Sequence, residues 1–292
     1  MALDVGQEET IPFTISLHEE AVASPSSKKA AGNGVEMHLI QAIQRAVLQT
    51  IKRTGGRAFE MNDILPIKEL CDRLLPSDLG LEIPKPQKVA ESPRRLRPIQ
   101  YIEVYEDAQV SMGIFVLPPG TSIPLHNHPQ MAVISRVLYG SMQVNAYDLV
   151  SAAEDEAFWA RKEKRRRNGQ LKNNRFPRFR ERHLRIAALK KSEVVTGPCT
   201  TELLPDKCNI HEFIASGDVG CAIFDILTPG YNPMEGRDCT YYRALLPIEG
   251  GTTEEPWHVL EPSLMPPSTF ISVDLPYMGP PLARNDTAAE LE

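Results

Sequence analysis

Two histidines, His126 and His128, stand one residue apart in the stretch "GTSIPLHNHPQ", in a chain that has only seven histidines. On an extended segment, the side chains at positions i and i+2 project from the same face. Imidazole is also the commonest protein ligand for transition metals. The pair therefore predicts a chelating site for a metal ion on a strand.

The residues around this pair resemble the first signature of the cupin superfamily, whose fold is a small double-stranded β-helix barrel. Gly120 precedes His126 by six positions, and Pro124 shapes the approach to the pair. Gly140 follows, and we expect it to close the next strand at a hairpin. The resemblance implies a cupin barrel around the histidines.

In that signature a glutamate usually follows the second histidine by four or five positions, where this chain has Ala132 and Val133. No carboxylate is available there, so a third histidine is needed. His211 lies at the head of the expected strand "NIHEFIAS" and is our candidate. We therefore expect His126, His128 and His211 to form a three-histidine metal site.

Three blocks make the resemblance more particular: "IPLHNHPQMAVISRVLYGSMQVNAYD", "NIHEF" and "CAIFDILTPGYNPMEGRDCTYYR". In their order and spacing they resemble the plant cysteine oxidases and the related animal cysteamine dioxygenase, over residues 36–243. The resemblance implies a non-haem Fe2+ enzyme that uses O2 to convert the N-terminal cysteine of proteins to cysteine sulfinic acid. In plants the substrates include ethylene-response transcription factors, whose degradation by the N-degron pathway then depends on oxygen.

A count of coordination positions agrees with this chemistry. An iron(II) ion has about six positions, and three neutral imidazoles leave about three of them open. A cysteine at a chain's N-terminus offers a thiolate and a free amine, which leaves one position for O2. A site of two histidines and one carboxylate would instead indicate a 2-oxoglutarate oxygenase.

The same matching gives further candidate site residues. Asp225 falls where the family has an acidic residue near the iron, so it is expected to orient the substrate amine, unless it only caps the "TPG" turn. It faces the pocket only if its two sequence neighbours face the outer layer, which the sequence leaves open. Tyr231 matches a family tyrosine that lines the same cavity. A simple packing role is the alternative for this residue. Cys239 and Tyr241 resemble a unit that a thioether links in the animal relative; the plant members work without an established link, so a free thiol is expected.

Composition sets the class of protein. Hydrophobic residues make up 42% and charged residues 24% of the 292 residues, so a sizeable core can form. No apolar run approaches the roughly 18 residues that a membrane span needs, and the first 20 residues lack the pattern of a signal peptide. The five cysteines are scattered, without CxxC spacing. We therefore expect a protein of the nucleus and cytoplasm that does not contact membranes.

The beginning of the chain is expected to be helical after a disordered leader over residues 1–35, which is small, polar and without periodicity. Apolar residues at helical spacing predict one helix over 36–54. A second helix is expected to start near Pro66, because proline suits a first turn. Together they form a helical extension over 36–80.

After a proline-rich linker the periodicity changes to two, in "YIEVYE", "SMGIFVL", "AVISRVLYG", "SMQVNAYD", "NIHEFIAS" and "CAIFDIL". Short strands in this number predict an all-β core. We expect one cupin-type domain over residues 36–260. Residues 261–292 are expected to cover the barrel and then to fray as a tail.

Positive charge is concentrated in one segment. Residues 161–191 contain fourteen Lys or Arg and two Glu, a net charge of +12, whereas the rest of the chain carries −18. We expect a basic loop, inserted over about 155–183 between two strands, which is solvated or serves nuclear import or an anionic partner. No helix-turn-helix or finger pattern is present, so direct nucleic-acid binding is not expected.

Two other functions stay open. One is a small-thiol dioxygenase for cysteamine or free cysteine, in which Arg136 is the basic residue available for the cysteine carboxylate. The other is a non-catalytic cupin module whose histidines hold zinc or nothing. A monomer is expected in each case.

Overall fold

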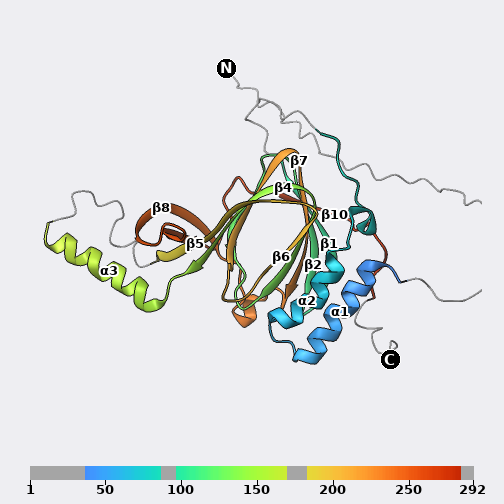
Figure 1. Cartoon of the computed structure of the whole chain (residues 1–292), viewed down its shortest axis with the longest axis horizontal. Helices are drawn as coiled ribbons and strands as arrows, with labels where there is room; N and C mark the ends of the chain where they lie inside the picture. The colour runs from blue at the N-terminus through green and yellow to red at the C-terminus, as the bar shows by residue number, and fades with distance from the viewer. Residues whose placement is uncertain (1–36, 87–96, 170–182, 284–292) are drawn as a thin grey trace, which may run out of the picture.

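The computed structural model describes residues 37–86, 97–169 and 183–283. A β-barrel forms its centre, with two helices on one side and a third helix that extends from the opposite side (Figure 1). The strands are β1 (Ile99–Glu106), β2 (Ser111–Leu117), β3 (Ser122–Asn127), β4 (Ala132–Leu149), β5 (Arg185–Thr196), β6 (Cys199–Leu203), β7 (Ile210–Thr228), β8 (Tyr241–Gly251), β9 (Pro256–Ser263) and β10 (Ser272–Leu275).

The barrel closes around the two longest strands. Strands β7, β3, β8, β9, β5 and β4 pair in that order, and β4 pairs back with β7 along nearly its whole length. The second half of β7 also pairs with β2, and the first half of β4 pairs with β6. The sheet thus closes on itself as a barrel, with each long strand paired along both of its edges. This confirms the expected all-β, cupin-type barrel.

Gly140 does not close a hairpin, contrary to the sequence expectation. It lies inside β4, where the register against β7 jumps from Gly140↔Cys221 to Ser141↔Ser216. Its φ is +79°, and a Cβ atom there would lie 1.9 Å from the Gly220 carbonyl oxygen. A glycine in this conformation makes a bulge, which bends a strand without reversing it. Strand β4 therefore bends at Gly140 and continues to Leu149.

Helix α1 (Leu39–Thr54) lies on the outer face of the barrel. Its buried stripe is the predicted one, and it packs in one apolar cluster with Phe224 and Ile226 of β7. The residues of the stripe are Ile40, Ile43, Val47 and Ile51. The outward side chains of β7 are thereby committed to packing against the helices.

Helix α2 (Met61–Cys71) begins earlier than expected, and Pro66 lies inside it. The Asp63 carboxylate accepts a hydrogen bond of 3.0 Å from the Glu60 backbone N–H, which caps the helix start. This cap fixes the beginning one turn before the proline. Pro66 is then tolerated in the interior at the loss of one backbone hydrogen bond. Two short 3-10 helices follow elsewhere, η1 (Pro76–Leu79) and η2 (Pro233–Glu235).

The inserted basic segment is helical where it is described, and the expected loop is wrong there. Helix α3 (Ala152–Arg167) starts at a capping box, in which the Glu154 N–H donates to the Ser151 hydroxyl at 3.3 Å and the Ser151 N–H donates to the Glu154 carboxylate at 2.9 Å. Acidic residues occupy its first turn and four basic residues its last, which suits the helix dipole. Residues 170–182 of the insertion lie outside the described part, as does the expected leader.

The end of the described chain returns to the helices. Strand β10 pairs in parallel with β1, and Gln44 of α1 exchanges hydrogen bonds of 2.7 and 3.2 Å with the backbone of Ala283. In the described ranges, no helix has the length and apolar character that crossing a membrane requires.

Candidate active site

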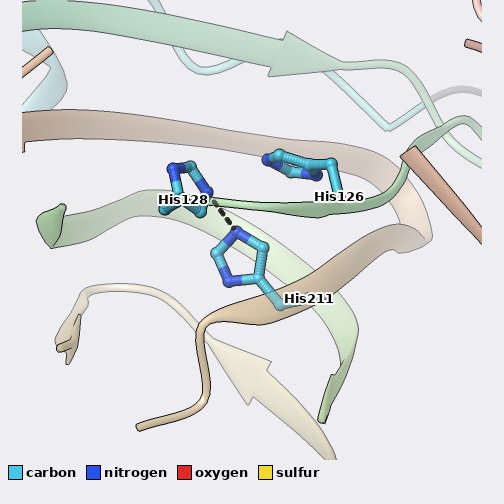
Figure 2. A group of neighbouring side chains, drawn as sticks. All are labelled: His126, His128 and His211. Atoms are coloured by element: carbon cyan, nitrogen blue, oxygen red, sulfur yellow. Dashed lines mark hydrogen bonds between the residues drawn. The ribbon is translucent and has the colours of Figure 1, made fainter. Parts of the chain in front are cut away.

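The three predicted histidines come together at one end of the barrel. His126 lies next to the end of β3 and pairs across to His211 near the start of β7, and His128 follows β3 directly. One ring nitrogen from each histidine lies within 4.8 Å of the others. The Nε2 atoms of His128 and His211 are 3.0 Å apart, as the dashed line in Figure 2 marks. The three rings therefore converge on one point.

Their hydrogen bonds show which nitrogen is free. His126 Nδ1 lies 2.8 Å from the Pro124 carbonyl oxygen, which only accepts, so Nδ1 carries the proton and Nε2 keeps its lone pair. The Tyr231 hydroxyl donates to the Asn127 carbonyl at 2.7 Å. Its oxygen then accepts from His128 Nδ1 at 3.0 Å, which leaves His128 Nε2 free. Such second contacts commonly fix the orientation and tautomer of metal-binding histidines.

Burial keeps the rings neutral. It lowers the pKa of His126 to about 4. It also holds the pKa values of His128 and His211 well below their usual value, and the neighbouring rings lower them further. Neutral imidazole is the form that binds a metal ion.

Asn209 holds the backbone of His128 in place. Its side-chain oxygen accepts from the His128 N–H at 3.1 Å, and its side-chain nitrogen donates to the His128 carbonyl at 2.6 Å. Because Asn209 stands two residues before His211, it joins the segments that carry two of the histidines. Its sequence neighbourhood carries no metal-ligand spacing, so only the fold reveals it.

Tyr231, Cys239 and Tyr241 also gather beside the histidines. The Cys239 thiol lies within hydrogen-bonding reach of the hydroxyls of both tyrosines. Tyr241 pairs with His126 between β8 and β3, with ring centroids 6.3 Å apart. The structure thus places the expected Cys-x-Tyr unit next to the metal-binding group, with Cys239 as a free thiol.

Asp225 faces the interior of the barrel. Its neighbours on β7 pack outward with the helices, so its own side chain, 6% exposed, points the other way. It pairs with Ser135 of β4 and forms a hydrogen bond with that hydroxyl, rather than capping the turn after the strand. Its Oδ1 atom has no hydrogen-bond partner among the described residues. Burial raises the pKa of this carboxyl to about 7.

Arg136 is directed away from the site. It is 4% exposed and lies on the outer face, where it donates to the Asp72 carbonyl at 2.8 Å and to the Leu74 carbonyl at 3.3 Å. It also contacts the Thr200 hydroxyl. The residue considered for a cysteine carboxylate therefore joins α2 to the barrel instead.

The donor set fits a metal ion. Three neutral nitrogens converge and no carboxylate joins them in the described ranges. Imidazole donors suit iron, zinc, copper and nickel, so the ligands alone do not choose among these metals.

Relatives of known name resemble the chain over most of its length. It is 35% identical over 184 residues to Plant cysteine oxidase 1 of Arabidopsis thaliana, covering 61% of this chain and 54% of that protein. It is also 35% identical over 230 residues to the 2-aminoethanethiol dioxygenase of Homo sapiens, covering 72% of this chain and 82% of that protein. The chain thus spans about half the length of the plant relative and most of the human one.

The family model extends over the whole candidate site. The model of the PCO_ADO family matches residues 70–282, a range that contains the three histidines, the acidic residue and the Cys-x-Tyr unit described above. The relatives named above are thiol dioxygenases, which are oxidoreductases. On this match and these identities, the chain belongs to the PCO_ADO family.

Proposed function

We propose that this protein is an iron(II)-dependent thiol dioxygenase that uses O2 to oxidise the N-terminal cysteine of proteins to cysteine sulfinic acid. The observation that carries the proposal is the convergence of three buried, neutral imidazoles without a carboxylate. This donor set leaves room for both a thiolate and an amine from the substrate. Iron(II) held by the three Nε2 atoms would supply the activation of O2 for addition to sulfur.

The chain's own residues would bind and orient the substrate. The Pro124 carbonyl and the Tyr231 hydroxyl keep protons on the Nδ1 atoms of their histidine partners, so that the Nε2 atoms stay available. Asp225 has a free oxygen and a pKa of about 7, so it can accept a hydrogen bond or a proton from the substrate amine. We propose catalytic roles for Asp225 and, through the position of His128, a supporting role for Tyr231.

The site favours a thiol with an amine and no nearby carboxylate. Arg136 is engaged on the outer face, so it is not available for the carboxylate of free cysteine. A peptide N-terminus and cysteamine both satisfy this requirement. Cysteamine is the second candidate, because the human relative is named 2-aminoethanethiol dioxygenase.

A protein substrate gives the reaction a signalling role. Sulfinic acid is hard to reverse, so oxidation would commit the substrate, such as an ethylene-response transcription factor, to the N-degron pathway when oxygen is present. Nucleus and cytoplasm are the compartments where such substrates would be met.

Mass spectrometry tests the proposal directly. The iron-loaded protein is mixed without oxygen with a Cys-initiated peptide, its N-acetylated form and cysteamine, and air is then admitted. A gain of about two oxygen atoms on the free-amine peptide alone is expected. Gain on cysteamine but not on the peptide would assign a small-thiol dioxygenase. No gain on any substrate, with one iron bound per chain, would favour a non-catalytic module.

A further inference from the structure

A cleft opens beside the histidines, between β5 and β6. It is small and open to solvent, with about 30 Å3 of free space, so it can take only a narrow segment of chain. Its floor includes His211 and Ser135. His211 belongs to the metal-binding group, and Ser135 is the hydrogen-bond partner of Asp225. The cleft therefore borders the candidate site.

The walls of the cleft are apolar. Val144 of β4, Leu203 of β6 and Phe213 of β7 line it, and all three are at most 9% exposed. The ring of Phe213 lies against that of His211, with centroids 4.4 Å apart. These walls suit a small or apolar side chain next to the metal-binding group.

The mouth of the cleft carries two ion pairs. Lys191 and Glu193 of β5 are 42% and 56% exposed, and their charged atoms are 3.9 Å apart. On the other side, Glu202 of β6 pairs with Lys68 of α2 at 2.5 Å. The Lys191–Glu193 pair is long and exposed, so a charged ligand can replace either partner at little cost.

We propose that this cleft is the subsite for the residues that follow the N-terminal cysteine of a protein substrate, with Lys191 and Glu193 selecting their charge. This inference rests on the proposed function. A cysteine bound through thiol and amine must lead the rest of its chain out past the histidines, and the cleft reaches His211. An extended chain advances about 3.3 Å per residue, so residue two lies along the apolar walls and residues three and four reach the charged mouth.

Charge reversal at the mouth tests the subsite. Binding of Cys-initiated peptides with Asp-Asp or Lys-Lys at positions three and four is measured by calorimetry on the iron-loaded protein without oxygen. K191E makes the mouth net negative, so we expect Kd to rise about 5- to 10-fold for the acidic peptide and to fall for the basic one. E193K should produce the opposite pattern.

Lys190 provides the matched control. It is the adjacent residue of β5, but it lies outside the cleft and pairs with Glu255 at 2.5 Å. K190E makes the same change of charge and should leave both Kd values within about 2-fold. Equal responses of K190E and K191E, or no response to K191E and E193K, would overturn the subsite.

Turnover after air is admitted separates the two proposals. Binding that follows the mouth charges, without oxygen gain on any peptide, would overturn the peptide oxidation and leave the subsite standing. Oxidation of both peptides, with Kd values that do not change with the charges at the mouth, would support the peptide oxidation and overturn the subsite. Cysteamine has no chain to occupy the cleft, so its affinity should be the same in all four proteins.

Discussion

His128 is positioned by groups on both of its sides. Asn209 holds its backbone, and the Tyr231 hydroxyl oxygen accepts a hydrogen bond from its Nδ1–H. The hydroxyl can take this role because its own proton is committed to the Asn127 carbonyl. A tyrosine that looks like a lining residue therefore decides which nitrogen of His128 faces the metal.

Replacing this hydroxyl should weaken metal binding. Y231F removes the acceptor for His128 Nδ1, and loss of such a contact typically lowers metal affinity about 10- to 100-fold. Competition with a chromogenic chelator measures the affinity. Y241F is the control, since the Tyr241 hydroxyl meets Cys239 rather than a ring nitrogen. Unchanged iron affinity in Y231F would contradict the tautomer assignment.

Asp225 should make the stability of the metal-free protein depend on pH. Its pKa is about 7 in the folded protein and about 3.9 in an unfolded chain. Between these values the folded protein retains a proton that the unfolded chain has released, so the free energy of unfolding falls as pH rises. D225N removes this effect. We expect its stability advantage over the unaltered protein to grow by about 3 kcal/mol between pH 4 and pH 7, and to level off above pH 7.

Urea unfolding of the chelated protein at several pH values measures this difference. D218N is the control, because Asp218 is an exposed residue of the same strand, β7. The same pH dependence in D218N would show that loss of any carboxyl from β7 produces the effect. A flat difference for D225N would show that the Asp225 carboxyl ionises freely in the folded state.

Residue type and spacing predicted that His126, His128 and His211 lie together, and the structure brings them together. The His-x-His pair and His211 can be recognised in the sequence because metal ligation demands particular side chains at particular intervals. Ser135 and Asn209 carry no such signal, because each contributes one ordinary polar group. Their roles follow from the register of β4 against β7 and from the path of the chain before His211. The direction of Asp225 likewise depended on packing partners far away in the sequence.

At the scale of elements, Arg136 joins the end of α2 to the barrel. R136A would leave the part-buried carbonyl of Asp72 and the buried carbonyl of Leu74 without this donor, and should lower the free energy of unfolding by about 2–4 kcal/mol. Chemical denaturation measures the loss. R243A, in an exposed ion pair of β8 with Glu261, should change stability by less than about 1 kcal/mol.

Activity distinguishes this role from a role in substrate binding. The folded fraction of R136A should oxidise a Cys-initiated peptide with an unchanged KM. A raised KM at normal stability would instead indicate that Arg136 takes part in substrate binding.

For the helices and strands that were predicted, the type of element was predicted better than its first and last residues. The period-two segments all fall on β1, β2, β4 and β7, since alternation reflects one buried and one exposed face. The pattern did not reveal β5, β6, β8, β9 and β10. Gly140 was mistaken for a turn because glycine at positive φ serves turns and bulges alike. The basic segment lacks an apolar stripe, so periodicity could not reveal α3; its capping box and the sign of its terminal charges were the available signals.

At the scale of the molecule, the last described residues complete the fold. Strand β10 pairs with β1, and the segment after it packs so closely that a Cβ on Gly80 would lie 2.9 Å from the Met278 backbone. A chain ending at residue 270 should therefore unfold at a Tm several degrees lower, or aggregate through the uncovered edge of β1.

Thermal unfolding followed by circular dichroism compares this truncation with a chain ending at residue 283. The chain that ends at residue 283 keeps every described contact, so its Tm should match that of the full chain. An equal Tm for both truncations would show that β10 adds nothing to stability.

The contacts between Gln44 and Ala283 span 239 residues, which bears on how the protein is made. Translation at about 5–20 residues per second separates the two partners by roughly 10–50 seconds. During that time α1 has left the ribosome, but neither the barrel face that it covers nor its final partner is complete. The nascent chain must hold an exposed apolar helix until synthesis is nearly finished, which makes it a natural client for chaperones that bind early in translation.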